Sequence, residues 1–173
     1  WGLDAGLARQ RHFPAINWLT SYSLYNRSLE GWYTENAGDE WNDSIATAMS
    51  VLTEESKLQE IVQLVGSDAL PEDQQLTLEV ARMLREFYLQ QNAFHDVDTY
   101  CKTQDQSKFL SVILHYKDLA EKAMSSGVEL ENVIGLPILE DIGRAKFEEN
   151  MVELLEKYDK TMTDDFAKLM EEA

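Results

Sequence analysis

Cysteine, proline and glycine are all scarce in this chain of 173 residues, and each shortage narrows the possible structures. Cys101 is the single cysteine, so no disulfide can form within the chain, and a reducing, cytosolic setting is expected. Three prolines and eight glycines leave few helix breakers. No apolar run approaches the roughly 20 residues that a membrane-spanning helix needs. We expect no signal peptide, because a basic stretch followed by an apolar one is missing.

Positive charge is also in short supply. The chain has 15 basic and 32 acidic residues, which gives a formal net charge of −17. A field of that sign repels phosphate backbones and anionic membrane surfaces. We therefore expect neither nucleic-acid binding nor direct membrane insertion. A chain of this length buries roughly 70% of the surface of its unfolded form, so it can fold as one domain without a metal or a disulfide.

The common catalytic motifs are missing as well. The sequence has no phosphate-binding P-loop, no G-x-G-x-x-G, no G-x-S-x-G and no Glu-x-x-His pair. His95, Asp96 and Asp98 place three ligand-type side chains within four residues, which could suit a metal ion. His12 and His115 stand in no spacing relationship to them, however. A hydrogen-bonded polar loop is the stronger interpretation, and we predict no metal site.

Apolar residues spaced three and four apart predict an all-α fold. One helix starts at Trp41 and ends at Val65, with a bend near residues 53–56, and Gly66 is suited to a left-handed C-cap. Pro71 suits the first turn of the next helix, so residues 66–71 form a tight turn between antiparallel helices. Thr103 and Gln106 form a predicted capping box that starts a helix ending at Gly127. The helix after Pro71 has an apolar stripe of Leu76, Val80, Leu84, Phe87 and Tyr88. The helix that starts at Thr103 has a stripe of Phe109, Val112, Ile113, Tyr116, Leu119 and Ala123.

Two segments leave alternatives open. Residues 1–23 do not support an amphipathic helix across Pro14, and we interpret them as loop and strand. The last helix carries a narrow apolar seam of Phe147, Met151, Leu155, Tyr158, Met162, Phe166 and Leu169. The seam either packs on the chain's own bundle, which we favour, or docks on a partner helix. The second option would make the chain a stand-alone acidic adaptor that binds a coiled coil.

Phe13 and Phe94 are the two aromatic residues that stand out in predicted loops. Aromatic side chains in loops usually fill gaps in a core, and residue chemistry alone favours that role for both. The alternative is a flat apolar wall on which a nucleic base stacks, worth about 1–3 kcal/mol for each ring.

Four stretches stand out in order along the chain: RQRHFPAINWLTSYS at residues 9–23, LQEIVQLVG at 58–66, LTLEVAR at 76–82 and YLQQNAF at 88–94. Together they resemble the C-terminal part of the catalytic A subunit of archaeal and vacuolar-type rotary ATPases. The likeness runs from Trp1 to about Lys146, and the final helix is similar only in kind.

The resemblance implies that this chain is a piece of a longer subunit. Residues 1–23 would be a remnant of the nucleotide-binding domain with its connecting loop, and residues 24–173 the C-terminal helical domain. The phosphate loop, the catalytic carboxylate and the Mg-binding residues would lie upstream. ATP or ADP with Mg would bind the intact subunit, while this piece alone would be inactive.

The resemblance also implies specific sites and partners. Phe13 and Phe94 would flank the adenine, and a helical tip would push the central stalk by steric contact. The tip residues are Gly66, Ser67, Asp68, Ala69, Leu70, Pro71, Glu72 and Asp73. Non-catalytic B subunits would alternate with this subunit in a ring, on the cytoplasmic side of the membrane, where ATP synthesis or hydrolysis is linked to ion transport.

Overall fold

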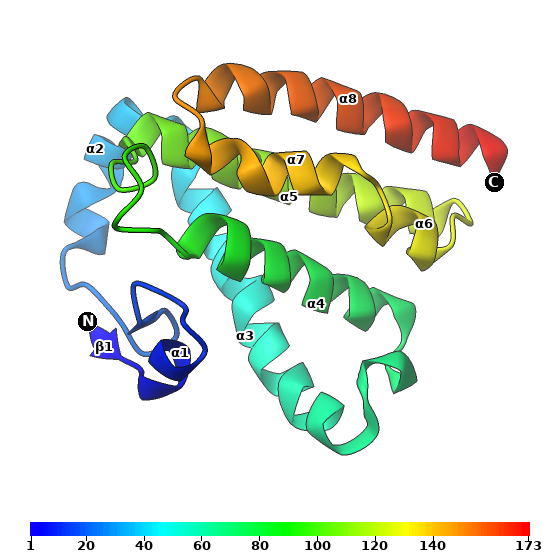
Figure 1. Cartoon of the computed structure of the whole chain (residues 1–173), viewed down its shortest axis with the longest axis horizontal. Coiled ribbons are helices and arrows are strands. Elements are labelled where there is room, and N and C mark those ends of the chain that lie inside the picture. The colour runs from blue at the N-terminus through cyan, green and yellow to red at the C-terminus, as the bar shows by residue number, and fades with distance from the viewer.

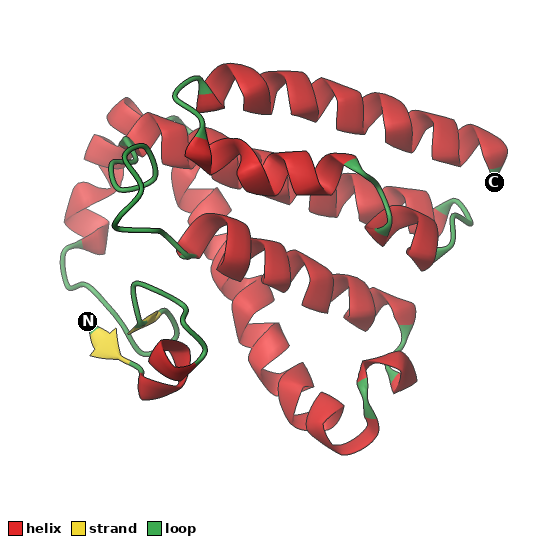
Figure 2. Cartoon of the chain, in the orientation of Figure 1, coloured by secondary structure: helices red, strands yellow, loops and turns green.

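The computed structural model describes residues 1–173, and almost all of its regular structure is helical (Figures 1 and 2). The predicted all-α class is confirmed. Helix α5 (Thr103–Ser125) lies in the middle of the bundle, where its buried face meets the neighbouring helices. Those neighbours are α2 (Asn26–Ala37), α3 (Trp41–Val65), α4 (Glu72–Met83), α6 (Leu130–Ile134) and α8 (Met151–Glu172).

The N-terminal segment forms a small separate layer beside the bundle (Figure 1). Strands β1 (Gly2–Leu3) and β2 (Ile16–Asn17) pair antiparallel, with Leu3 opposite Ile16. The expected strand remnant is thus present. The short helix α1 (Ala5–Arg9) between them was not predicted, because it buries no side chain and so shows no apolar period. Asp4 caps it by accepting hydrogen bonds from the backbone N–H groups of Gly6 and Leu7.

Helices α3 and α4 form the predicted antiparallel hairpin. The helix α3 is continuous through Thr53–Ser56, where we expected a bend. The buried side chains Ala48, Leu52, Glu55 and Leu58 form one face that runs through this segment, so no bend is needed. Gly66 ends α3 with φ 87° and ψ 160°. The positive φ agrees with the prediction, but this ψ lies outside the left-handed helical region and in one that only glycine adopts readily.

The turn between α3 and α4 contains the 3₁₀ turn η1 (Ser67–Ala69). Pro71 stands at the N-cap of α4, one residue before the expected position, and its carbonyl accepts from the N–H groups of Gln74 and Gln75. Glu72 and Asp73 occupy the first turn, as expected for the positive end of the helix dipole.

Helix α4 continues into a π-helical turn, η2 (Leu84–Leu89), which the sequence did not predict. The wider turn directs Phe87 toward α7 (Ile138–Arg144). Gly143 makes this approach possible, because a Cβ there would lie 2.7 Å from Cε1 of Phe87. After the loop, Lys102 and not Thr103 caps α5, and the side chain of Gln106 donates to the carbonyl of Cys101. The predicted capping box is therefore wrong.

Helix α8 packs along α5, and its residues Met151, Leu155, Met162 and Phe166 are buried (Figure 1). Phe166 lies 5.8 Å from the ring of Tyr116 on α5, measured between centroids. Packing within the bundle is confirmed, so this seam is not free for a coiled-coil partner. Phe147 is not part of it, because it lies in the preceding turn η3 (Ala145–Phe147) and is 36% exposed. None of the helices is long and apolar enough to cross a lipid bilayer.

Candidate functional site

Phe13 and Phe94 lie on segments that are far apart in the sequence but meet in the fold. Phe13 stands between α1 and β2, and Phe94 in the loop between η2 and α5. The exposed fractions of their side chains are 52% and 97%, so the core-filling interpretation is wrong for both. Both line one open pocket of about 470 Å³, together with Arg11, Gln90, Lys146 and Phe147.

One backbone hydrogen bond and one longer side-chain contact to a backbone carbonyl hold the two walls of this pocket together. The N–H of Gln91 donates to the carbonyl of Phe13 at 2.8 Å. The side-chain amide of Gln90 lies 3.5 Å from the carbonyl of Arg11, a residue with φ 59°. A left-handed arginine is an uncommon conformation, and here it turns the chain two residues before Phe13. The mutual position of the two phenylalanines is thus set by main-chain contacts.

The buried ring of His12 packs on Trp18 of the same N-terminal segment, and Trp18 in turn packs against the core of the bundle. The centroids of the His12 and Trp18 rings lie 5.5 Å apart. Burial lowers the pKa of His12, and the positive charges of Arg85 and Lys146 lower it further. His12 therefore belongs in its neutral form in the folded protein near neutral pH.

The loop that carries Phe94 is braced from within by the residues that a metal site would have used. Oδ2 of Asp98 accepts from the backbone N–H of Asn92 at 2.6 Å, and Asp98 is buried. Nδ1 of His95 accepts from the N–H groups of Val97 and Asp98 at 3.3 Å. No three His, Cys, Asp or Glu side chains converge as metal ligands would. These contacts are those of a hydrogen-bonded polar loop.

Two pocket residues, Lys146 and Phe147, were missed by the sequence analysis. Both belong to the short turn η3, which the apolar seam led us to assign to the last helix. Phe147 lies 4.9 Å from the ring of His95, measured between centroids, so η3 contacts the loop of Phe94. No spacing in the sequence connects residues 146–147 with residue 94. Besides the aromatic rings, the pocket is lined by the cations of Arg11 and Lys146 and by the carboxylate of Asp98.

The predicted rotor-contact tip lies at the far end of the α3–α4 hairpin, away from the pocket (Figure 1). Every tip residue except Leu70 is exposed. Beside it on α3, the apolar side chains of Ile61, Leu64 and Val65 are also exposed, with Leu64 at 85%. An apolar cluster of this kind on a projecting turn is typical of a surface that contacts another protein.

One helical rod connects the tip to the pocket. Helix α4 begins directly after the tip, and η2 ends at Leu89, next to the loop that carries Phe94. At about 1.5 Å per residue, slightly less in the π turn, the rod is roughly 25 Å long. The tip and the loop of Phe94 are thus the two ends of one continuous helical segment.

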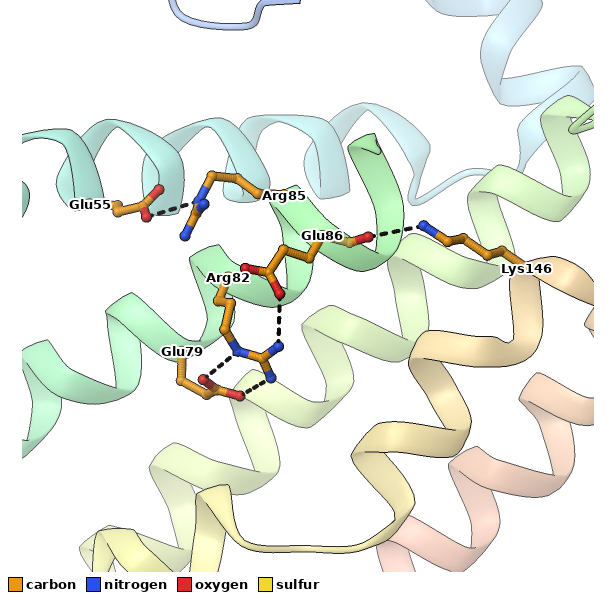
Figure 3. A network of polar contacts seen from close by, with 6 residues as sticks. All are labelled: Glu55, Glu79, Arg82, Arg85, Glu86 and Lys146. Atoms are coloured by element: carbon orange, nitrogen blue, oxygen red, sulfur yellow. Dashed lines mark hydrogen bonds and ion pairs between the residues drawn. The ribbon is translucent and has the colours of Figure 1, made fainter. Parts of the chain in front are cut away.

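Charged side chains fix the pocket end of this rod to its neighbours (Figure 3). Nε of Arg85 lies 3.0 Å from Oε1 of the buried Glu55 on α3. Arg82 pairs with Glu79 at 2.6 Å and with Glu86 at 3.1 Å along the rod itself. Burial raises the pKa of Glu55, while Arg85 opposes the shift. The Glu55–Arg85 pair is the one that joins two helices and is largely shielded from water.

Comparison with known proteins agrees with this architecture. The family model described as the C-terminal domain of V and A type ATP synthase matches residues 30–134, which contain the tip and Phe94. The A subunit of the A-type ATP synthase of Methanopyrus kandleri is 50% identical over 175 residues, covering 100% of this chain and 30% of that protein. The same subunit of the Methanosarcina acetivorans enzyme is 53% identical over 150 residues, covering 87% of this chain and 26% of that protein.

A bacterial relative extends the comparison. The V-type ATP synthase alpha chain 1 of Clostridium tetani is 48% identical over 171 residues, covering 98% of this chain and 29% of that protein. The chain thus spans about 30% of the length of these relatives. The similarity includes the last helix, beyond Lys146, where the likeness expected from the sequence ended. On these grounds the chain belongs to the family of C-terminal domains of V and A type ATP synthases.

Proposed function

We propose that this chain is the moving helical domain of a catalytic A subunit, and that it supplies both aromatic walls of the adenine pocket. The observation that carries the proposal is the rod α4–η2, which runs from an exposed tip to a pocket lined by Phe13 and Phe94. Two exposed aromatic rings suit a flat base, and the cation of Arg11 suits an anionic ligand. A nucleotide combines both features.

The phosphates and Mg would be held by the part of the subunit outside this chain. No P-loop occurs here, so no residue of this chain can position a γ-phosphate. We therefore infer that the chain alone does not hydrolyse ATP and binds nucleotide weakly. Its partners would be B subunits in an alternating ring and the central stalk, in a peripheral part of a membrane-bound complex on its cytoplasmic side.

Coupling would follow from differential binding. The bond between Gln91 and Phe13 keeps the two rings together, so a base that stacks on both while its phosphates are held outside this chain would favour one position of this domain relative to the rest of the subunit. The rod would transmit that preference to the tip and so to the stalk. In the reverse direction, rotation driven by ion flow would move the tip, and the rod would transmit this movement to the nucleotide pocket during ATP synthesis.

The adenine pocket is tested by Phe94→Ala in the full-length subunit within its assembled complex. We expect ATP affinity to fall by about fivefold to 150-fold, the equivalent of about 1–3 kcal/mol of lost stacking. Tyr100→Ala is the matched control, because Tyr100 is an aromatic of the same loop that is 82% exposed and does not line the pocket. Unchanged ATP affinity in Phe94→Ala would remove Phe94 from the pocket.

The tip is tested by neutralising it without changing its bulk. Combined Asp68→Asn, Glu72→Gln and Asp73→Asn substitutions should leave ATP-driven rotation intact, because we propose a steric contact. Replacing Leu64 and Val65 with aspartate should impair rotation, since both side chains are exposed beside the tip. Loss of rotation in the neutralised variant would show that charge drives the contact instead.

A further inference from the structure

The C-terminal end of η2 is held by a side chain from a distant segment. Nζ of Lys146, on η3, donates to the carbonyl of Glu86 at 2.9 Å and to the carbonyl of Gln90 at 2.8 Å. Figure 3 shows the first of these contacts. The last carbonyls of a helix lack donors within the helix, and a cation there also favours the negative end of the helix dipole. Lys146 thus fills the role of a C-terminal cap supplied from outside.

From Gln90 the contacts lead directly to both phenylalanines. The N–H of Gln90 bonds to the carbonyl of Arg85, which closes the π turn. The next residue, Gln91, bonds to the carbonyl of Phe13, and Asn92 bonds to Asp98. The carbonyl of Gln90 is therefore the point at which the helix ends and the loop of Phe94 begins. A contact that fixes the position of this carbonyl therefore also fixes the start of the loop that carries Phe94.

The ammonium of Lys146 is partly withdrawn from water and lies near two carboxylates. Asp98 in the loop and Glu86 on η2 stabilise its ammonium, whereas burial opposes the charge and, as the largest effect, lowers its pKa. The neutral ring of His12 lies on the side of the N-terminal segment. Hydrogen bonds from an ammonium in such a place are stronger than those between neutral groups.

We propose that Lys146 is a positioning residue for the adenine pocket: its ammonium clamps the carbonyls of Glu86 and Gln90 and so orders the loop that presents Phe94. The inference rests on the proposed function of that pocket. Lys146 acts through the backbone of the loop and needs no contact with the base itself. Its effect is therefore on nucleotide affinity, because disorder in the loop must be removed before Phe94 can stack.

The test compares variants of the full-length subunit in its complex. Lys146→Met keeps the length of the side chain and removes the donors, and should raise KM for ATP by about tenfold, the size of one charge-assisted hydrogen bond, with kcat changed by less than about twofold. Lys146→Arg keeps a cation with several donors and should stay within about threefold of the parent. Lys160→Met is the matched control on the exposed face of α8.

A second readout follows the loop itself. Amide hydrogen exchange of residues 90–98 should be faster in Lys146→Met than in the parent and unchanged in Lys160→Met. If Lys146→Met does not assemble, Lys146→Gln replaces it. Its amide keeps two N–H donors on a shorter side chain, but the hydrogen bonds of a neutral amide are weaker than those of an ammonium, so an intermediate KM is expected. A KM equal to that of the parent overturns the inference.

The outcomes separate the two proposals. A normal KM in Lys146→Met, together with a raised KM in Phe94→Ala, refutes the positioning role and leaves the pocket standing. A normal KM in both refutes the pocket and the inference together. A raised KM in both, with faster exchange of the loop and recovery in Lys146→Arg, supports both.

Discussion

Removal of the Phe166 ring measures how firmly the last helix is part of the bundle. Phe166 is fully buried on α8 and packs against Tyr116 on α5. Replacing a buried phenylalanine with alanine costs about 3–5 kcal/mol, because apolar contacts are lost and a cavity remains. A domain is stable by only about 5–15 kcal/mol, so Phe166→Ala should remove a large part of the total.

The assay is urea and thermal unfolding of the 173-residue chain. At about 2–4 °C per kcal/mol for a chain of this size, Phe166→Ala should lower Tm by roughly 6–20 °C. Phe94→Ala is the matched control, since it makes the same chemical change at a side chain that is 97% exposed. We expect the control to change the free energy of unfolding by less than about 0.5 kcal/mol.

The two variants together also decide between packing and partner docking. If α8 were a detachable docking helix, Phe166→Ala would cost the isolated chain little. A difference of less than about 1 kcal/mol between the two variants would refute the core assignment of α8. The same control also shows that a loss of ATP affinity in Phe94→Ala does not come from unfolding.

Three further predictions concern the backbone and the buried charges. Gly66→Ala should destabilise the chain by about 1–3 kcal/mol, because φ 87° and ψ 160° suit only glycine, while no neighbouring atom would clash with the added methyl group. Gly31→Ala within α2 is the control and should be neutral or stabilising by up to about 1 kcal/mol. Equal chemical-denaturation midpoints for the two variants would contradict the backbone argument. His12 has a lower pKa in the folded chain than its ordinary value of 6.5, so between these two pKa values the unfolded chain binds a proton that the folded chain does not. The free energy of unfolding should therefore fall as pH drops from about 6.5 to the folded pKa. His12→Gln should lose this pH dependence, and an unaltered dependence in that variant would exclude His12 as its source. A double-mutant cycle of Glu55→Gln and Arg85→Met, read by urea unfolding, should give a coupling energy of about 1–3 kcal/mol, and a value near zero would show that the 3.0 Å approach contributes nothing.

Local physical chemistry in the sequence was sufficient for the main helices and the hairpin turn. Apolar periodicity identified α3, α4, α5 and α8, and Gly66 with Pro71 marked the turn. The same reasoning missed α2, whose exposed faces carry no clear apolar stripe. It also predicted that a capping box of Thr103 and Gln106 starts α5. This box does not form, because the N-cap residue is Lys102, one residue earlier. Local signals predict which segments are helical more reliably than they predict how each one ends.

The pocket, in contrast, exists only through tertiary contacts. From residue chemistry alone, Phe13 and Phe94 were predicted to fill gaps in the core, whereas both are exposed. Only the resemblance suggested that they act as a pair. Their common pocket depends on the bond between Gln91 and Phe13, and its third side, Lys146 and Phe147, comes from a turn near the last helix. Helix formation depends on residues three and four apart in the chain, so the sequence by itself determined the main helices. Contacts between segments that are distant in the chain depend on how the helices pack, and only the folded structure decides them.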